Sequence, residues 1–355
     1  MRVNVVAMKA RIAIANFQHN SHATVSIVNL PRMTTLLLAS VLASGCGDNL
    51  AVNPAADAPH LDAVLRSDAP ALAGIKHVFV IAMENHSWAN IKGSPSAPYI
   101  NSLLSSAGYA ENYKTPPGLH PSEPNYIWLE AGDNLGVLDS KDPGAHHFAT
   151  TEHLVSQLDA VGYTWKNYAE NIDGLSCPLV SSGLWAPRHA PFLYFDDVTN
   201  NNSATSANCI AHVRPYPELA GDLVAGNIAN YNFITPNLCS DMHGALPDCD
   251  PARVDTIRIG DDWLATQVPM LLASAAYADH GAIFIVWDEG EPGPAYDGPI
   301  GMIVLSANVK PGHASPTAFD HSSFVRTMQD IFNVRPYLRG AATANNLSEL
   351  FLKFP

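Results

Sequence analysis

Two short stretches of this 355-residue chain are apolar at almost every position. They are residues 77–83 (HVFVIAM) and residues 282–287 (AIFIVW), and both are rich in β-branched and aromatic side chains. A strand with one wet face alternates between apolar and polar residues, whereas a strand of a parallel sheet covered by helices is apolar on both faces. The two stretches therefore predict an α/β protein whose central strands are fully buried.

Segments with helical spacing alternate with further apolar strands along the chain. We predict strands over 109–115, 163–169, 230–235 and 301–306, and helices over 97–107, 122–131, 150–161, 260–278 and 322–332. This alternation predicts a three-layer sandwich, in which a mostly parallel central sheet is flanked by helices. Hydrophobic residues make up 47% of the chain and charged residues 15%, so a substantial core is expected.

The N-terminal part of the chain is not expected to belong to this sandwich. Residues 36–43 form an apolar run that is too short to span a membrane, and Cys46 follows it. We interpret residues 1–46 as a signal peptide with a lipobox, which implies a lipid anchor at Cys46 and a place in the bacterial periplasm or cell envelope. Simple secretion with cleavage near Gly45 is the alternative. Residues 47–75 are expected to be a tether and residues 76–355 the globular domain.

Four further cysteines are consistent with export to an oxidising compartment. They are Cys177, Cys209, Cys239 and Cys249, and a loop-rich insertion is expected at about 171–229. Three pairings are possible, and the pairing of nearest neighbours closes the shortest loops. Because the spacing contains no CxxC pair, a zinc knuckle is not indicated. We predict the disulfides Cys177–Cys209 and Cys239–Cys249.

Acidic and amide side chains follow three of the predicted strands, at the point where each strand ends. Glu84 and Asn85 follow the strand over 77–83, Asp241 follows 230–235, and the pair Asp288–Glu289 follows 282–287. An acid that ends a strand is most often a helix cap or a solvated loop group. Ligands of open α/β sheets, however, bind outside the carboxyl ends of the strands, where these acids would meet.

Ser122 is expected at the start of a helix that Gly132 ends. Serine is a favoured N-cap, and Pro124 fits the first turn. A hydroxyl at this place faces unpaired backbone N–H groups and the positive end of the helix dipole, which together form a site for a phosphate. An ordinary helix cap is the simpler interpretation when the segment is taken alone.

Five sequence blocks together resemble a known family. In chain order they are VIAMENHS, PSEPNY, TPNLCSDMH, VWDEG and DHSS, and they span roughly residues 76–334. This order is similar to that of the phosphoesterase family, which contains bacterial acid phosphatases and phosphatidylcholine-type phospholipases C and belongs to the alkaline phosphatase superfamily. The resemblance implies an alkaline phosphatase-like fold and a divalent metal ion.

The net charge of −14 and the lack of a basic run argue against nucleic acid as a partner.

The resemblance also implies roles for individual residues. Ser122 would be the nucleophile, and histidines would assist catalysis or bind the substrate. The implied metal ligands are Glu84, Asn85, Ser122, Asp288, Glu289 and Asp241. The implied catalytic residues are Ser122, His189, His243 and His321, and the implied substrate-binding residues are Asn85, His120 and His189. Asp241, His243 and His321 fall where the superfamily places a second metal or the histidines that replace it.

These implications predict a metal-dependent acid phosphatase that hydrolyses small phosphate monoesters through a phosphoserine on Ser122. Mixed carboxylate, hydroxyl and imidazole ligands suit Mg, Ca, Mn, Fe or Zn. A phospholipase C or phosphodiesterase would use the same site, although a serine nucleophile in place of threonine and the lack of a long C-terminal region favour a monoesterase. A sulfatase is disfavoured because the Ser122 block lacks an arginine. A non-enzymatic surface lipoprotein is the remaining alternative.

Overall fold

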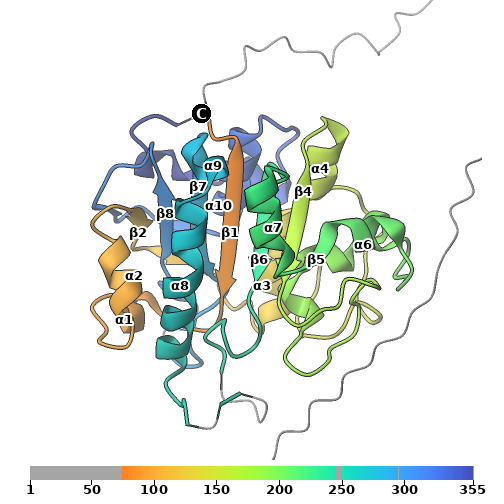
Figure 1. Cartoon of the computed structure of the whole chain (residues 1–355), viewed down its shortest axis with the longest axis horizontal. Helices are drawn as coiled ribbons and strands as arrows, with labels where there is room; N and C mark the ends of the chain where they lie inside the picture. Colours follow the sequence, from red (N-terminus) through yellow and green to blue (C-terminus); the bar gives the residue numbers. More distant parts are fainter. Residues whose placement is uncertain (1–73, 245–248, 251, 295, 355) are drawn as a thin grey trace, which may run out of the picture. The chain divides into compact units, whose positions relative to one another are not determined.

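The computed structural model describes residues 74–244, 249–250, 252–294 and 296–354 (Figure 1). The predicted signal and lipobox region with Cys46 lies outside the described residues, as does the predicted tether except for its last two residues. Among the described residues, every helix is too short or too polar to cross a membrane.

The centre of the domain is an eight-stranded sheet with the order β5-β4-β6-β1-β7-β8-β2-β9. Its strands are β1 (His77–Met83), β2 (Gly108–Ala110), β4 (Trp165–Ala169), β5 (Val213–Pro215), β6 (Tyr231–Thr235), β7 (Gly281–Trp287), β8 (Met302–Ser306) and β9 (His313–Ser315). The five strands from β5 to β7 run parallel to one another. Strand β8 is antiparallel to both of its neighbours. The prediction of a mostly parallel sheet is therefore confirmed.

The middle of this sheet is buried on both faces. Val80 of β1 pairs with Phe233 of β6 on one side and with Phe284 of β7 on the other. Every residue of β6, β7 and β8 is buried, as continuous apolar runs predict for strands covered by helices. At roughly 25 cal/mol per Å² of apolar surface removed from water, these strands supply a large share of the free energy of folding.

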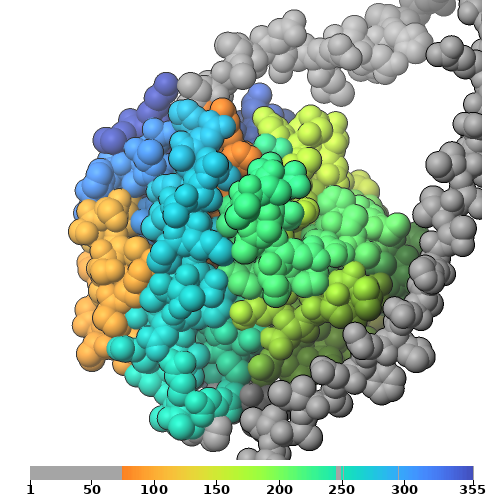
Figure 2. All heavy atoms as spheres, viewed as in Figure 1, coloured from red at the N-terminus to blue at the C-terminus, as the bar shows by residue number. Residues whose placement is uncertain are grey.

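Helices cover both faces of the sheet, which completes the three layers. Helices α7 (Glu218–Ala225) and α8 (Thr256–Leu272) lie in front of the sheet in Figure 1, and their side chains cover it in Figure 2. Helices α3 (Ser122–Ala131), α4 (Leu154–Ala160) and α10 (His321–Ile331) pack against one another behind it. The remaining helices are α1 (Trp88–Ile91), α2 (Pro98–Leu103), η2 (Pro187–His189), η3 (Pro191–Tyr194), α5 (Asp196–Thr199), α6 (Ala207–His212), α9 (Ala275–Ala278), η4 (Arg339–Ala342) and η5 (Leu347–Leu350).

Three segments differ from the sequence-based expectations. The expected strand over 109–115 is broken, because β2 joins the main sheet while β3 (Tyr113–Lys114) pairs with β10 (Phe319–Asp320) in a separate two-stranded sheet. The expected helix over 260–278 starts earlier, at Thr256, and stops where the Ser274 hydroxyl caps the separate helix α9. The expected loop-rich insertion over 171–229 has regular structure in its second half, where α6, β5 and α7 extend the sandwich.

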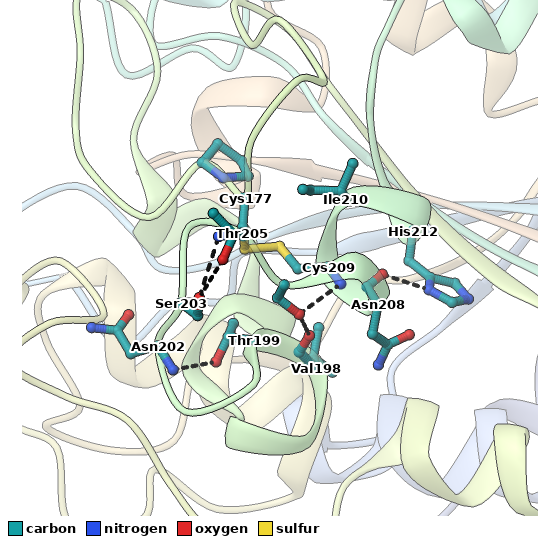
Figure 3. The surroundings of a disulfide bond; sticks show 12 residues. Cys177, Val198, Thr199, Asn202, Ser203, Thr205, Asn208, Cys209, Ile210 and His212 are labelled. Atoms are coloured by element: carbon teal, nitrogen blue, oxygen red, sulfur yellow. Dashed lines mark hydrogen bonds between the residues drawn. A yellow bond between two sulfur atoms is a disulfide. The ribbon is translucent and has the colours of Figure 1, made fainter.

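Both predicted disulfides are present. Cys177 pairs with Cys209, and Cys239 pairs with Cys249. Figure 3 shows that the first disulfide joins the early part of the 171–229 segment to helix α6. The Ser206 hydroxyl caps α6 by accepting a hydrogen bond from the Cys209 N–H group at 3.3 Å. Disulfides of this kind form and persist in oxidising compartments.

Candidate active site

Three loops meet at the carboxyl ends of the adjacent strands β6, β1 and β7. The Glu84 N–H group donates to the Asp241 carbonyl oxygen at 2.8 Å, which joins the β1 loop to the β6 loop. The Asn85 N–H group donates to Asp288 Oδ1 at 3.1 Å, which joins the β1 loop to the β7 loop. Parallel strands end at the same edge of a sheet, and the structure thus brings the predicted acids together at that edge.

Ser122 enters the same site from helix α3. The N-cap of this helix is Pro121, so Ser122 is its first helical residue and not the N-cap that we expected from the sequence. The Ser122 hydroxyl makes no cap and instead donates to Glu84 Oε2 at 3.0 Å. The reason is that Pro121 adopts the extended backbone that precedes a helix, which moves the serine one position inward. Gly132 ends the helix in the left-handed conformation, as predicted.

Four acidic side chains, which we call the carboxylate cluster, lie around Ser122. They are Glu84, Asp241, Asp288 and Glu289, and all four are buried. Three of their oxygens have no hydrogen-bond partner although they are buried, and the side-chain oxygen of Asn85 is in the same condition. These atoms are Glu84 Oε1, Asp241 Oδ2, Asp288 Oδ2 and Asn85 Oδ1. Because an unpaired buried polar atom costs free energy, such a concentration marks a site that binds something.

The carboxylate cluster cannot remain fully ionised without a compensating positive charge. Burial, together with the charges of neighbouring acids, raises the pKa of Glu84 and of Glu289 to about 8. Burial raises the pKa of Asp241 and of Asp288 well above their usual range, and the Glu84 charge adds to this shift for Asp288. Such shifts are typical of functional sites, where acids are gathered to bind a cation or to move protons.

His189 and His243 lie beside the carboxylate cluster. His189 Nε2 is 3.1 Å from Glu84 Oε1, and His189 Nδ1 is 3.4 Å from Asp241 Oδ2. The Nε2 contact is close enough for an ion pair but is not aligned as a hydrogen bond, so that ring nitrogen has no hydrogen-bond partner. Tyr126 of helix α3 stacks on the His189 ring with 4.9 Å between ring centres. His243 Nδ1 is also without a partner.

The pKa values of these two histidines are shifted in the same direction. Burial lowers the pKa of His189 well below its usual value, and the positive charge of Arg188 adds to that shift. Burial and the Arg188 charge also lower the pKa of His243. Both rings are therefore neutral over much of the pH range, and each gains a proton only in acid.

His120 and His321 are held differently, because both ring nitrogens of each are engaged. His120 Nδ1 is hydrogen-bonded to Glu289 Oε2 at 2.6 Å, and His120 Nε2 is hydrogen-bonded to Asp297 Oδ1 at 2.9 Å. His321 Nε2 donates to the Asp288 carbonyl oxygen at 2.7 Å, and its Nδ1 accepts from the Tyr113 hydroxyl at 3.0 Å. Burial lowers the pKa of His321 to about 4. The two rings thus fix the Asp288 backbone and the Glu289 side chain.

Sequence reasoning missed three residues at this site. The Thr115 hydroxyl donates to the Asp288 carbonyl oxygen at 2.6 Å, and the Asn125 amide donates to Glu289 Oε2 at 3.2 Å. Asn125 lies three residues after Ser122 on the same helix face, and this spacing was available in the sequence. Arg188 precedes His189 in the short helix η2, and only its position beside that histidine indicated a role.

Comparison with known proteins identifies the family of this chain. The model of the phosphoesterase family matches residues 96–335. A phosphatidylinositol-3-phosphatase of Mycobacterium tuberculosis is 29% identical over 273 residues, which cover 75% of this chain and 80% of that protein. A probable acid phosphatase of Kluyveromyces lactis is 25% identical over 227 residues, which cover 62% of this chain and 48% of that protein. The match to the yeast protein thus spans about half of its length.

Similar solved structures support the fold. A lipoteichoic acid synthase of Listeria monocytogenes superposes with a TM-score of 0.50 at 9% identity, over 77% of each chain. A phosphonate monoester hydrolase of Agrobacterium radiobacter superposes with a TM-score of 0.50 at 12% identity, over 79% of this chain and 78% of that chain. These likenesses show the fold alone and confirm the predicted alkaline phosphatase-like sandwich. Because the family model covers more than half of the chain, the protein belongs to the phosphoesterase family, and its class is that of the phosphoric ester hydrolases.

Proposed function

We propose that this protein is a metal-dependent acid phosphatase that hydrolyses phosphate monoesters through a phosphoserine on Ser122. The observation that carries the proposal is the contact of the Ser122 hydroxyl with Glu84 Oε2 at 3.0 Å. This contact joins the hydroxyl of the first residue of helix α3 to a buried carboxylate at the end of β1. The relatives named as acid phosphatases support the choice of reaction.

The residues present fit a divalent cation. Unpaired buried oxygens of Glu84, Asn85 and Asp288 supply hard ligands, and Ser122 and Glu289 complete the proposed set. Within the described part of the chain, no three His, Cys, Asp or Glu side chains form a metal site by themselves. The proposed set therefore depends on an amide and a hydroxyl as well as on acids. A bound cation would supply positive charge. That charge would stabilise the ionised Ser122 oxygen and offset the negative charge of the phosphoryl oxygens.

The chain itself supplies the nucleophile and its surroundings. Glu84 Oε2 is the acceptor already in place for the Ser122 proton. Attack by the Ser122 oxygen on phosphorus breaks the bond to the alcohol and leaves a phosphoserine. Water then hydrolyses the phosphoserine and releases inorganic phosphate.

The departing alcohol oxygen needs a proton, and two histidines are suited to deliver it. His189 and His243 each carry a ring nitrogen without a partner, whereas both nitrogens of His120 and His321 are engaged in hydrogen bonds. Because the pKa of His189 and of His243 is lowered, the protonated form of each accumulates only in acid. An acidic pH optimum follows from this requirement.

Replacement of Ser122 tests the proposal. Ser122→Ala should lower kcat for p-nitrophenyl phosphate at least about a thousand-fold, because the nucleophile is removed. The matched control is Ser102→Ala, since Ser102 is an exposed serine of helix α2. A Ser122→Ala enzyme with full activity would contradict the proposal. The substrate panel should include phosphatidylinositol 3-phosphate, after the name of the mycobacterial relative, and bis-p-nitrophenyl phosphate as a diester.

A further inference from the structure

Glu291 connects two of the three loops that meet at the site. It lies two residues after the Asp288–Glu289 pair in the β7 loop, and its carboxylate reaches groups that follow β1. Glu291 Oε1 is hydrogen-bonded to His86 Nδ1 at 2.7 Å and accepts from the Asn90 amide at 2.6 Å. Glu291 Oε2 accepts from the Ser87 N–H group at 2.7 Å and also from the Ser87 hydroxyl. Both oxygens of this carboxylate thus join the β7 loop to the β1 loop.

His86 connects these two loops to the third. Its Nε2 is hydrogen-bonded to the Met242 carbonyl oxygen at 3.3 Å and to Thr256 Oγ1 at 3.1 Å. Met242 lies between Asp241 and His243 in the β6 loop, and Thr256 is the first residue of helix α8. The His86 side chain is only 12% exposed, so these contacts are largely shielded from water. One imidazole ring thus contacts the β7 loop, the β6 loop and the start of α8.

The Met242 backbone depends on such contacts, because its φ of 81° lies in the left-handed region that a residue with a long side chain rarely adopts. The Met242 side chain packs over Gly260 of α8, where an added Cβ would lie 2.3 Å from Met242 Cγ. A conformation of this kind persists only where the surrounding structure holds it. The His86 contact with the Met242 carbonyl oxygen is part of that support. It therefore helps to set the positions of Asp241 and His243 on either side.

We propose that His86 and Glu291, which we call the brace, are positioning residues that hold the carboxylate cluster in the arrangement that binds a divalent cation. This role rests on the function proposed above, because the groups that the brace positions are proposed metal ligands. The brace acts on Asn85, Asp241 and Glu289 through the loops that carry them. Groups behind the ligands of a metal orient those ligands, and their loss costs about 10- to 100-fold in metal affinity or activity.

Binding of Mn²⁺ tests the brace in the full chain after divalent metal has been removed. Glu291→Ala and His86→Ala should each bind Mn²⁺ about 10- to 100-fold more weakly by calorimetry, and kcat for p-nitrophenyl phosphate should fall as well. Glu291→Gln keeps one acceptor oxygen, so its Mn²⁺ affinity should lie between those of Glu291→Ala and wild type. Because the two residues act as one unit, the double variant should lose less than the product of the two single losses. Losses that multiply would overturn the inference.

Amide hydrogen exchange tests the brace without metal and without turnover. In Glu291→Ala, exchange should become faster in segments 84–87, 241–244 and 288–291, because these are the loops that the brace joins. Exchange in the strands β1 and β7 should stay as slow as in wild type. A failure of the Ser122 mechanism would leave this result unchanged, so the two proposals can fail separately.

Glu349→Ala is the matched control. The Glu349 carboxylate also accepts from two side chains, the hydroxyls of Ser315 at 2.8 Å and Thr317 at 2.6 Å, but it lies beside the edge strand β9. This variant should leave Mn²⁺ affinity, kcat and exchange in the three segments unchanged. Two results for Glu291→Ala would overturn the inference: wild-type exchange in the three segments, or faster exchange there with Mn²⁺ affinity and kcat both equal to those of wild type.

Discussion

At the scale of single residues, the chemistry of the site depends on which side chains are held by hydrogen bonds to other groups and which remain available to react. Ser122 is free to act because Pro121 takes the N-cap position. His321 is engaged on both sides, since it donates to the Asp288 carbonyl oxygen and accepts from the Tyr113 hydroxyl. In the proposed mechanism, a histidine therefore either fixes the acids or exchanges protons, according to its hydrogen bonds.

The loss of rate caused by replacing the proton donor, His189 or His243, should depend on the leaving group of the substrate. The loss caused by replacing His321 should not. Replacing the proton donor by Gln should slow hydrolysis of alkyl phosphates about 100-fold more than that of p-nitrophenyl phosphate, whose leaving group needs no proton. The His321→Gln variant should slow both substrates equally, because it disturbs only the position of Asp288. Steady-state rates over a series of leaving groups measure this difference. Equal losses across the series for both His189→Gln and His243→Gln would contradict the assignment.

The fall of the rate with rising pH should depend on the same two residues. Burial lowers the pKa of His189 and of His243, so the protonated donor is lost as the pH rises through that lowered value. For alkyl phosphates, kcat should therefore fall between acid and neutral pH. The variant that lacks the proton donor should show a flat profile over this range. A wild-type rate that increases towards neutral pH would contradict the role of a protonated histidine.

At the scale of elements, helix α3 is fixed at both of its ends. Its start carries Ser122, and its last turn carries Glu130, which accepts from His153 Nδ1 at 2.9 Å. His153 is the N-cap of α4, and its Nε2 donates to Asp197 of α5 at 3.1 Å. Both Glu130 and His153 are buried. This chain of contacts joins helix α3 to α4 and α5.

The Glu130–His153–Asp197 contacts should make stability depend on pH. Burial opposes the protonated ring, but the hydrogen bonds to Asp197 and Glu130 outweigh it and raise the pKa of His153. The resulting stabilisation is fully present below the unfolded value of about 6.5 and is lost as the pH rises through the folded value. His153→Gln should therefore lower the free energy of unfolding by about 3 kcal/mol in mild acid, and by less in alkaline buffer.

Chemical denaturation at several pH values measures this loss. The matched control is His147→Gln, since His147 makes a similar contact with Asp196 at 2.6 Å but is partly exposed. It should change the free energy of unfolding by less than about 1 kcal/mol. A His153→Gln loss that stays constant from acid to alkaline pH would show that the ring is not charged in the folded protein.

At the scale of the whole molecule, the sheet was predictable and the loops were less so. The runs over 77–83 and 282–287 identify β1 and β7 because parallel strands must be apolar on both faces. The sequence therefore predicted that Glu84 and the Asp288–Glu289 pair, which follow these two strands, lie close together. The placement of Arg188 was not, because it depends on the fold of an irregular segment closed by the Cys177–Cys209 disulfide. The division of 109–115 into β2 and β3 was also missed, although the polar pair Glu111–Asn112 lies between the two strands.

Removal of divalent metal should affect the molecule in two ways. The proposed cation offsets repulsion within the carboxylate cluster, so its removal by EDTA should abolish phosphatase activity and lower the melting temperature by several degrees. Both effects should reverse when one suitable metal is added back, and elemental analysis of the purified protein identifies that metal. Asp288→Asn should bind the metal more weakly in the same assay. Activity and melting temperature that are both unaffected by EDTA would contradict a metal-dependent site.

The most direct test of the central claim is the stereochemical course at phosphorus. The purified enzyme hydrolyses a phosphate monoester made chiral with oxygen isotopes, in the presence of an alcohol acceptor that keeps the product chiral. Attack by Ser122 followed by attack of the acceptor consists of two in-line displacements, each of which inverts the configuration. The account predicts net retention. Net inversion would show that the acceptor attacks the substrate directly, and it would contradict a phosphoserine on Ser122.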